Sequence, residues 1–451
     1  MALAIVVVLL VIGSVIFHLM SPWWFTPIAS NWAMMDNTVN LTFWVTGTVF
    51  VLINLFMAYA IVRFRHRKGQ RAAYNPEDPK LELWLTIVTT IGVAALLAPG
   101  LFVWAKFVTV PSEATVVEVL GQQWNWSYRY PGKDGVLGST DAKLITLDNP
   151  FGIDPGDVRG QDDVLVQGQE LHLPINKPVK ILMRSRDVTH QFAVPQFRVK
   201  MDMVPGMVTY FWLTPTRTGS FNVLCEQLCG IAHFTMRGRV VVEEQAAYDA
   251  WLASQATFAV AQAVRAGDPA AGATLYAVCS ACHGPTGDGN QALNAPRLAG
   301  QASWYLARQL SAFRHGLRGT DPRDAFGQQM KPMAAMLADD GAVRDVVAYV
   351  TSLPVIARPA PTVSGDAARG KVLYDTCAAC HGAQGEGAWA TNAPRLAGMS
   401  DWYLGRQLQN FRQGIRGAHP QDFAGVQMAQ IASFLRDDRA VADVLAYMDT
   451  L

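Results

Sequence analysis

Soft metal ligands gather in one stretch of the chain, which ends in the run Cys225-Glu-Gln-Leu-Cys229-Gly-Ile-Ala-His233-Phe-Thr-Met236. Together with His190, this run supplies two thiolates, two imidazoles and one thioether, which are the ligands of a copper electron-transfer site. One copper ion would use one cysteine, whereas two cysteines four residues apart can bridge two ions. A disulfide or half of a zinc site also uses two cysteines, but the histidine and methionine that follow favour a binuclear copper centre.

Two further cysteine motifs form a repeat. Cys279-Ser-Ala-Cys282-His283 and Cys377-Ala-Ala-Cys380-His381 are offset by 98 residues, and the same offset places Ala295–Gly300 on Ala393–Gly398 without a gap. C-x-x-C-H is the attachment signature of c-type haem, in which the thiols bond to the vinyl groups and the histidine binds the iron. The repeat therefore predicts a duplicated domain with one covalently bound haem c in each copy.

The repeat also selects a second axial ligand for each haem. Met330 aligns with Met428, whereas Met333 and Met336 have no methionine as their counterpart. A methionine opposite the histidine raises the reduction potential, as an electron carrier requires. We therefore expect Met330 and Met428 to bind the two irons.

Composition indicates that part of the chain lies in a membrane. Of its 451 residues, 51% are hydrophobic and only 16% are charged, and the net charge of +1 gives no indication of nucleic-acid binding. All six cysteines belong to the three motifs above, so none is left for a structural disulfide. Covalent haem attachment and copper loading both suit an exported compartment.

Three apolar segments are long enough to cross a membrane, at residues 2–20, about 41–62 and about 83–107. The first could be a signal peptide, but it lacks a basic start and a cleavage site, which favours a retained helix. The basic run Arg63–Arg71 between the other two predicts a cytoplasmic loop, so the chain after Lys106 lies outside. Three tryptophans suit the outer membrane interface: Trp23, Trp24 and Trp32.

The copper-ligand run resembles subunit II of haem-copper cytochrome c oxidases, the subunit that carries the CuA centre. The resemblance implies a copper-ligand set of His190, Cys225, Gln227, Cys229, His233 and Met236. Gln227 stands where the family has a glutamate that bonds copper through its backbone carbonyl. The glutamate side chain also reaches a magnesium ion in the family, and that charge is absent here.

The same resemblance assigns roles outside the ligand set. Trp124 matches the surface tryptophan through which relatives accept an electron from cytochrome c. Glu82 matches a glutamate near the start of a proton path into subunit I, although a solvated charge at a helix end is an equal alternative. Asp187 and Asp202 match positions that support the ligands or dock the donor, and plain surface acids are the competing interpretation.

The fold class that follows is multidomain. We expect a transmembrane anchor of about three helices over residues 1–111, with a hairpin at 41–107, and an all-β, cupredoxin-like Greek-key barrel over 112–244, the copper domain. Strands are expected at 115–120, 179–183 and 238–242. Two all-α cytochrome c domains should cover 264–354 and 362–451, the first and second haem domains, with helices at 401–411 and 440–448. They resemble di-haem cytochromes with tandem class I domains, in which Pro296 and Pro394 would orient the haem histidines.

The resemblance implies subunit II of a respiratory cytochrome c oxidase in the bacterial inner membrane, multi-pass, with its copper and haem domains on the periplasmic face. Electrons from a cytochrome c or a respiratory complex would reach copper through the haems and then haem in subunit I, where oxygen is reduced with proton pumping. Subunits I and III are the expected partners. The first haem domain follows the copper domain through a linker at about 244–267, so it is expected to be the immediate donor to copper. A nitric oxide reductase subunit and a free-standing electron carrier are the alternatives.

Overall fold

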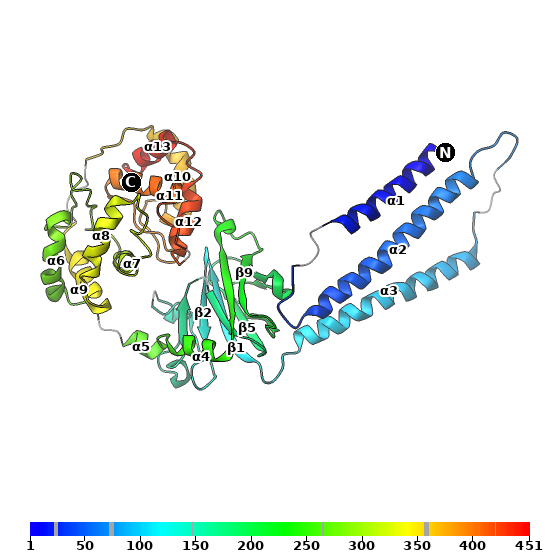
Figure 1. The fold of residues 1–451 in the computed structure, drawn as a ribbon, viewed down its shortest axis with the longest axis horizontal. Coiled ribbons are helices and arrows are strands. Elements are labelled where there is room, and N and C mark those ends of the chain that lie inside the picture. The colour runs from blue at the N-terminus through cyan, green and yellow to red at the C-terminus, as the bar shows by residue number, and fades with distance from the viewer. Residues whose placement is uncertain are drawn as a thin grey trace.

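Three parts follow one another along the chain (Figure 1): N-terminal helices, a β-sandwich and a helical region. The computed structural model describes residues 1–21, 26–71, 76–146, 148–168, 170–263, 266–355, 360–419 and 421–451. Trp23 and Trp24, which are expected at the membrane interface, lie outside the described residues.

The N-terminal part consists of α1 (Ala2–Met20), α2 (Ala33–Arg63) and α3 (Pro79–Val108). All three are long and apolar enough to cross a membrane. The 31 residues of α2 span about 46 Å, more than a hydrocarbon core of about 30 Å requires. Its first turn extends beyond the predicted start because Asp36 forms an ion pair with Arg198 of the sandwich, with a nitrogen–oxygen distance of 2.7 Å.

Two five-stranded sheets form the sandwich. In order across the first sheet lie β3 (Val164–Gln167), β2 (Asn125–Tyr130), β1 (Thr115–Gln122), β5 (Val179–Ser185) and β8 (Thr209–Leu213). Across the second lie β4 (Glu170–Pro174), β10 (Arg237–Glu243), β9 (Gly219–Cys225), β6 (His190–Val194) and β7 (Val199–Met203). β1 pairs in parallel with β5, and β10 with β4, while the other pairs are antiparallel. The three expected strands are confirmed as parts of β1, β5 and β10.

A tryptophan cluster joins the sandwich to the membrane helices. Trp32 is 1% exposed, so it is buried against the sandwich rather than placed at the membrane interface as expected. Its indole nitrogen donates to the carbonyl of Trp212 at 2.9 Å, and the Trp212 indole donates to the carbonyl of Lys106 at 3.2 Å. These bonds hold the start of α2 and the end of α3 against the first sheet.

The linker after the sandwich is mostly folded onto it. α4 (Gln245–Ala253) is held by Trp251, whose ring stacks on His172 at 3.9 Å between centroids. α5 (Phe258–Gln262) follows, and Phe258 is buried at 1% exposure beside Phe151. Most of the described part of the expected linker at about 244–267 is therefore folded onto the sandwich.

Each haem domain contains four helices in the same order. The first has α6 (Pro269–His283), α7 (Ser303–Arg314), α8 (Ala325–Ala335) and α9 (Asp340–Ser352). The second has α10 (Ala367–His381), α11 (Asp401–Arg412), α12 (Phe423–Ala432) and α13 (Asp438–Met448), which confirms the two expected helices. The first and last helices of each copy cross at a glycine, because a Cβ on Gly272 or Gly370 would lie 1.9 Å from the carbonyl oxygen of Asp345 or Asp443.

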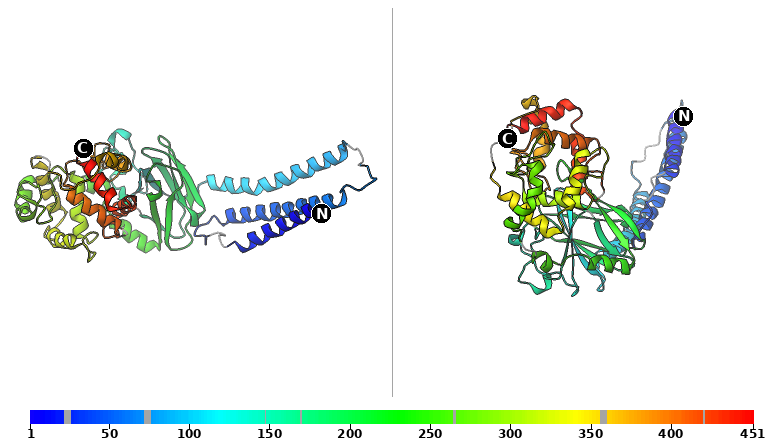
Figure 2. Two further views of the ribbon diagram at one scale, coloured as in Figure 1. Left: turned by 90° about the horizontal axis from the view of Figure 1, so that it is seen from above. Right: turned by 60° about the vertical axis from the view of Figure 1, so that its left-hand side comes forward.

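The two haem domains lie at different distances from the sandwich. α10, α11 and α12 lie over one end of it, whereas α6 and α9 lie at the outer edge of the helical region (Figure 1). Two further views agree (Figure 2). The copy that follows the sandwich in sequence is therefore the more distant one in space.

Candidate copper and haem sites

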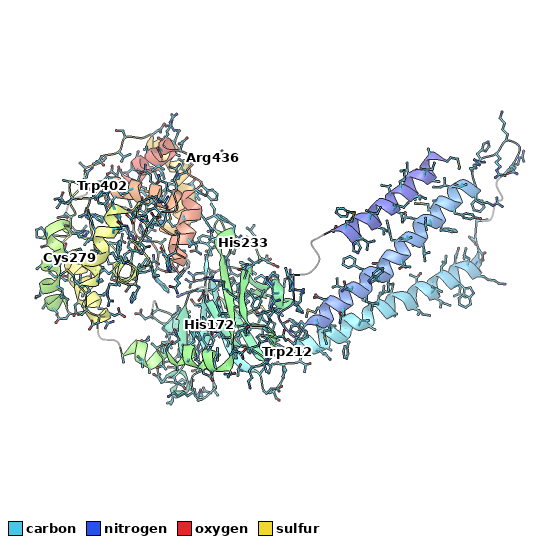
Figure 3. The ribbon with its side chains drawn as sticks, viewed as in Figure 1. His172, Trp212, His233, Cys279, Trp402 and Arg436 are labelled. Atoms are coloured by element: carbon cyan, nitrogen blue, oxygen red, sulfur yellow. The ribbon has the colours of Figure 1, made fainter. Side chains whose placement is uncertain are left out.

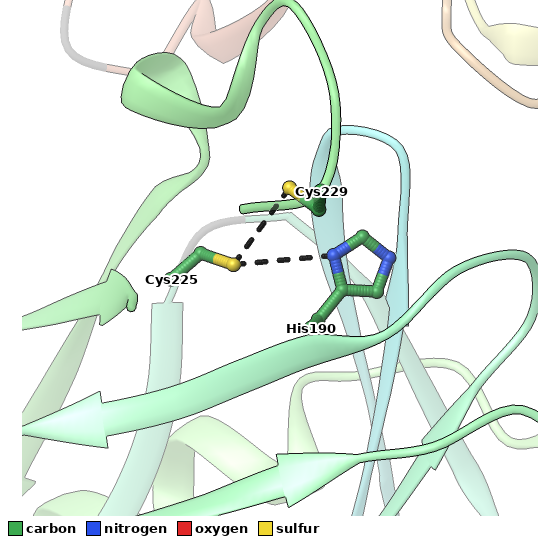
Figure 4. Close-up of side chains that lie close together, drawn as sticks. All are labelled: His190, Cys225 and Cys229. Carbon is green, nitrogen blue, oxygen red and sulfur yellow. Dashed lines mark hydrogen bonds between the residues drawn. The ribbon is translucent and has the colours of Figure 1, made fainter. Parts of the chain in front are cut away.

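The predicted copper ligands come from two strand ends and one loop. His190 begins β6, Cys225 ends β9, and the loop between β9 and β10 carries Cys229, His233 and Met236. The two cysteine sulfurs lie 3.8 Å apart, and the Cys225 sulfur lies 4.0 Å from Nδ1 of His190 (Figure 4). The structure brings these residues together as the sequence predicts.

The rest of the predicted ligand set surrounds the same two sulfurs. The Cys229 sulfur lies 3.4 Å from Nδ1 of His233 and 3.8 Å from the Met236 sulfur. The Cys225 sulfur lies 3.3 Å from the backbone carbonyl oxygen of Gln227. Each sulfur therefore has one imidazole and one weaker donor beside it, an arrangement that fits two soft metal ions sharing two thiolates.

Asp187 orients the first histidine ligand. Its carboxylate lies 2.8 Å from Nε2 of His190 and also accepts from the backbone nitrogen of Gln123 at 2.6 Å. Burial lowers the pKa of His190, but its hydrogen bonds with Asp187 and Cys225 outweigh burial and raise that pKa. Because Nε2 faces Asp187, Nδ1 is the nitrogen directed at the sulfurs, as a metal ligand requires.

The cysteine pair holds one proton tightly. The hydrogen bond between the two thiols lowers the pKa of Cys225 to about 3 and raises the pKa of Cys229 far above its ordinary value. Copper binding by both thiolates would therefore have to displace the proton of Cys229.

Trp124 lies directly behind the copper-ligand loop. Its indole nitrogen donates to the carbonyl of Cys229 at 3.3 Å, and the Gln123 side chain donates to the same oxygen at 2.8 Å. The loop can come this close because Gly230 has a φ of +127°, and a Cβ there would lie 2.9 Å from the Trp124 ring. Trp124 is only 4% exposed, so it is not the surface residue that the sequence predicts.

One cavity is lined by both haem motifs. Cys279, Cys282 and His283 lie on its wall in the first domain, and it continues to Cys380 and His381 in the second. Trp124 also lines it. In Figure 3, Cys279 lies toward the outer edge of the helical region, and His233 lies at the end of the sandwich that faces this region.

Both haem histidines are oriented as iron ligands. Nδ1 of His283 lies 2.8 Å from the carbonyl oxygen of Pro296, and Nδ1 of His381 lies 2.7 Å from that of Pro394. Burial lowers the pKa of each histidine, which favours the neutral imidazole that binds a metal. The two cysteines and the histidine of each motif therefore fit a covalently attached haem.

A ring of polar side chains joins the two haem domains beside this cavity. Arg318 donates to Gln309 and Gln407, and Arg416 donates to the same two amide oxygens, over distances of 2.6 to 3.0 Å. Burial raises the pKa of Tyr305, but Arg416 and Arg318 outweigh burial and lower it. Among the described residues, neither Arg318 Nε nor Arg416 Nε has a hydrogen-bond partner. Each of these two buried guanidinium groups therefore has an N–H without an acceptor. Such a pair of cations fits an anionic cofactor, and the carboxylates of haem are anionic.

The methionine candidates differ in position. Met330 and Met333 of α8 line the cavity in the first domain, and Met428 of α12 lines it in the second. Met336 is 61% exposed and lies outside the cavity wall. The structure thus leaves Met330 and Met333 as candidates in the first copy, and the choice of Met330 stays a prediction from the repeat.

The second haem domain contacts the sandwich at Trp124, which contradicts the expectation that the first domain is the immediate donor. Gln427 donates to the carbonyl of Trp124, and Gln122 donates to the carbonyl of Ala390. The guanidinium of Arg186 lies 4.6 Å from the centre of the Trp389 ring. Proximity in sequence misled the prediction because α4 and α5 fold along the sandwich and lead the chain away from Trp124.

Two predicted residues lie apart from the copper ligands. Glu82 is exposed near the start of α3, where its backbone carbonyl accepts from the Thr86 hydroxyl at 2.8 Å. Asp202 accepts from the Gln191 side chain at 2.6 Å and has no described contact with a copper ligand. Sequence reasoning did not predict the contact between the sandwich and the second haem domain, which involves Gln122, Arg186, Trp389 and Gln427. The one available signal was the replacement of Gln291 by Trp389 between two otherwise similar copies.

Comparison with known proteins gives separate matches for the sandwich and the helical region. Residues 115–244 match the family described as cytochrome c oxidase subunit II, periplasmic domain, and residues 269–354 and 367–451 each match cytochrome c. An alternative cytochrome c oxidase subunit 2 of Bradyrhizobium diazoefficiens is 60% identical over 57% of this chain and 94% of its own length.

The helical region has relatives of its own. Cytochrome c4 of Azotobacter vinelandii is 36% identical over 41% of this chain and 90% of its own length. The crystal structure of reduced cytochrome c4 from Pseudomonas stutzeri, 28% identical, covers 41% of this chain and all of that chain with a TM-score of 0.34. The family matches at residues 115–244, 269–354 and 367–451, with the observed helices and strands, confirm the predicted fold class of apolar N-terminal helices, a cupredoxin-like sandwich and helical cytochrome c domains. The chain therefore belongs to the cytochrome c oxidase subunit II family and carries cytochrome c domains after its periplasmic domain.

Proposed function

We propose that this chain is the electron-accepting subunit of a respiratory oxidase. Electrons from an external donor reach the first haem, pass to the second haem and then through Trp124 to a binuclear copper centre. Haem in a partner subunit I receives them, and oxygen is reduced there to water with proton pumping. The observation that carries this proposal is the position of Trp124 between the second haem domain and the copper ligands.

The path from the second haem domain to the copper ligands consists of contacts that the chain itself makes. Trp124 lines the cavity that also contains Cys380 and His381. Its indole donates to the carbonyl of Cys229, which is a copper ligand in the proposal. Cys380 also packs against the hydrophobic core of the sandwich. A haem attached at Cys380 would therefore have its attachment edge close to Trp124.

When bound, the haems and the copper pair supply one-electron chemistry, and the residues around them hold and orient these groups. Asp187 fixes His190, while the carbonyls of Pro296 and Pro394 fix the two haem histidines. Gln227 contributes its carbonyl oxygen to the copper ligands. The buried ring of Arg318 and Arg416 would neutralise haem carboxylates between the domains.

The membrane helices provide the surface for the partner subunits. Their apolar side chains are largely exposed, as expected of faces that meet lipid, subunit I or subunit III. The basic run between α2 and α3 favours a cytoplasmic position for that loop in the bacterial inner membrane, with the sandwich and haem domains in the periplasm. Glu82 would then lie at the cytoplasmic side, where a proton path into subunit I could begin.

Trp124→Phe tests the proposal. Reduction of both haems by an added donor should be nearly unchanged, whereas electron arrival at copper should slow by about tenfold, or about 1.4 kcal/mol in the barrier. Stopped-flow absorbance at the haem and copper bands measures both steps. Copper reduction at the wild-type rate would show that electrons reach copper by another route.

A matched pair of glutamine variants isolates the contact itself. Gln427 donates to the Trp124 carbonyl, while its repeat counterpart Gln329 is exposed on the first domain. Loss of one hydrogen bond of about 1 kcal/mol in Gln427→Ala should slow copper reduction about fivefold. Gln329→Ala should leave the step from the second haem to copper unchanged, because Gln329 lies on the first domain. Oxygen or nitric oxide consumption by the purified complex then separates the oxidase from a nitric oxide reductase, and a chain that purifies alone would favour a free-standing carrier.

A further inference from the structure

The second haem domain uses one face to contact the sandwich. The residues of this face contact Trp124, Gln122, Arg186 or Phe234 of the sandwich, or pack against the hydrophobic core of the sandwich. They are Cys380, Trp389, Ala390, Gln427, Ile431 and Phe434, which we call the inner face. Because the two domains are a gapless repeat, each position of the inner face has an equivalent in the first domain.

The equivalent positions of the first domain form a surface that we call the outer face. They are Cys282, Gln291, Ala292, Gln329, Met333 and Met336. All of them are exposed except Met333, which is half-buried. The corresponding members of the inner face are half-buried apart from Phe434. The duplication therefore presents the same part of the fold twice, covered by the sandwich in one copy and uncovered in the other.

The outer face carries no charge at these six positions, and four of them are apolar: Cys282, Ala292, Met333 and Met336. Met336 is 61% exposed, and two cavity-lining neighbours extend the apolar surface, Leu293 at 49% and Val278 at 46% exposure. Cys282 belongs to the haem motif and is itself exposed, so the face surrounds one edge of the first haem site. Exposed apolar side chains gathered at a functional edge are typical of an interaction site.

The sandwich shows what kind of partner this fold face accepts. In the described contacts with the inner face it presents Gln122, Trp124 and Phe234, which are uncharged, and one cation, Arg186, which lies over an aromatic ring. Interfaces of this composition depend on apolar contact and a few hydrogen bonds rather than on charge pairs. A partner for the outer face should present the same composition around its own redox group.

We propose that the outer face is the docking site of the external electron donor, a c-type cytochrome whose exposed haem edge is ringed by uncharged, apolar side chains. The proposal rests on the proposed function, because it makes the first haem the acceptor of external electrons. One electron moves from the reduced iron of the donor, which is oxidised, to the first haem, which is reduced, and no bond forms or breaks. Docking then depends little on ionic strength, since salt screens only charged contacts.

Binding of two probe cytochromes to the purified full-length complex tests the proposal. Both are class I cytochromes c; one has a lysine-ringed haem edge and the other has an uncharged, apolar edge. Isothermal titration calorimetry with the oxidised probes measures the Kd of each. Stopped-flow absorbance with the reduced probes follows reduction of the first haem. The Kd of the uncharged probe should change less than about threefold between about 0.02 and about 0.5 M salt.

Charge introduced into the outer face should weaken this binding. Ala292→Glu and Met336→Glu, on separate segments of the face, should each raise the Kd of the uncharged probe by about tenfold. Val372→Glu places the same charge on the exposed surface of α10, where Val372 is 71% exposed, and should change nothing. Haem reduction by ascorbate with a small mediator should be equal in all variants, because it requires no protein docking.

Three results would overturn the proposal. Wild-type binding in both glutamate variants would place the donor elsewhere. Tighter, steeply salt-dependent binding of the lysine-ringed probe would show a charged docking site. A change limited to self-association of the complex would make the outer face a contact between two copies. Because binding and first-haem reduction precede copper reduction, none of these results depends on the outcome of the Trp124 test.

Discussion

Both haem domains hold their attachment histidine in the same way, whereas the surfaces beside those histidines differ. His283 and His381 each bond a proline carbonyl thirteen residues later, at 2.8 and 2.7 Å. Beside them, Cys282 is exposed, whereas Cys380 is half-buried against the sandwich, and this burial raises the pKa of the Cys380 thiol to about 12. Duplication has kept the residues that are predicted to hold the haems and allowed the contact surface to diverge.

The two copies also differ at positions where the second copy meets the sandwich. Gln291 of the first domain corresponds to Trp389 of the second, and Leu293 corresponds to Thr391. Trp389 receives Arg186 on its ring, while the Thr391 hydroxyl donates to the carbonyl of Cys380 at 2.8 Å. These changes fit the second copy to a fixed intramolecular contact and leave the first copy with an open apolar surface.

Removing a predicted copper ligand should have the largest effect, because it should abolish the copper signal and leave both haem sites unchanged. Cys225→Ser should abolish the mixed-valence copper signal, because Cys225 contributes one of the two bridging sulfurs. Both haem spectra should be unchanged, since the haem motifs share no ligand with copper. Electron paramagnetic resonance and visible absorbance of one sample measure both. Survival of the copper signal would contradict the binuclear assignment.

Changing the axial methionines should distinguish the two haems from each other. Met330→Leu and Met428→Leu should each turn one low-spin haem into a five-coordinate or otherwise ligated form with a lower potential. Only Met428→Leu should also alter the step from the second haem to copper, because the domain of Met428 contacts Trp124. Redox titration followed by absorbance measures the potentials.

Met333→Leu is the matched control, because Met333 lines the same cavity as Met330 but aligns with Ile431. It should leave both potentials near the wild-type values. If Met333→Leu lowered a potential and Met330→Leu did not, the repeat would have selected the wrong ligand.

The copper ligands could be predicted from sequence because their spacing lies within one loop and one strand end. Cys225, Cys229 and His233 are close in the chain, so local backbone geometry brings them together. The haem motifs could be predicted for the same reason, since each spans five residues at the end of a helix. Their repeat also revealed the domain duplication.

The contact between the second haem domain and Trp124 could not be predicted from local sequence spacing. It joins Gln427 to a residue 303 positions earlier, and no local pattern specifies that pairing. The linker encouraged the opposite assignment, because only the structure shows that Phe258 buries itself in the sandwich and carries the chain past Trp124. Long-range contacts of this kind depend on how whole surfaces fit, which spacing along the chain does not record.

The smallest effect should come from Arg186, the cation that the sandwich presents to the inner face in the described contacts. Arg186 lies over Trp389 and donates to Gln122 at 3.1 Å, so Arg186→Ala removes a cation–π contact of about 0.5–1 kcal/mol and one hydrogen bond. The domains stay tethered at an effective concentration that can reach roughly millimolar, which limits the loss of docked molecules. Transfer from the second haem to copper should therefore slow only about threefold, less than in Trp124→Phe.

Arg217→Ala supplies the matched control for this change. The Arg217 guanidinium lies 5.4 Å from the centre of the Phe221 ring, on the sandwich but outside the described contacts with the haem domains. The same substitution there should leave the transfer rate unchanged. Laser-flash reduction of the haems, followed at the copper band, measures both variants. A loss in Arg186→Ala as large as that in Trp124→Phe would mean that the Arg186–Trp389 contact, rather than the Trp124 path, limits transfer, and a loss in Arg217→Ala would trace the effect to sandwich stability instead of docking.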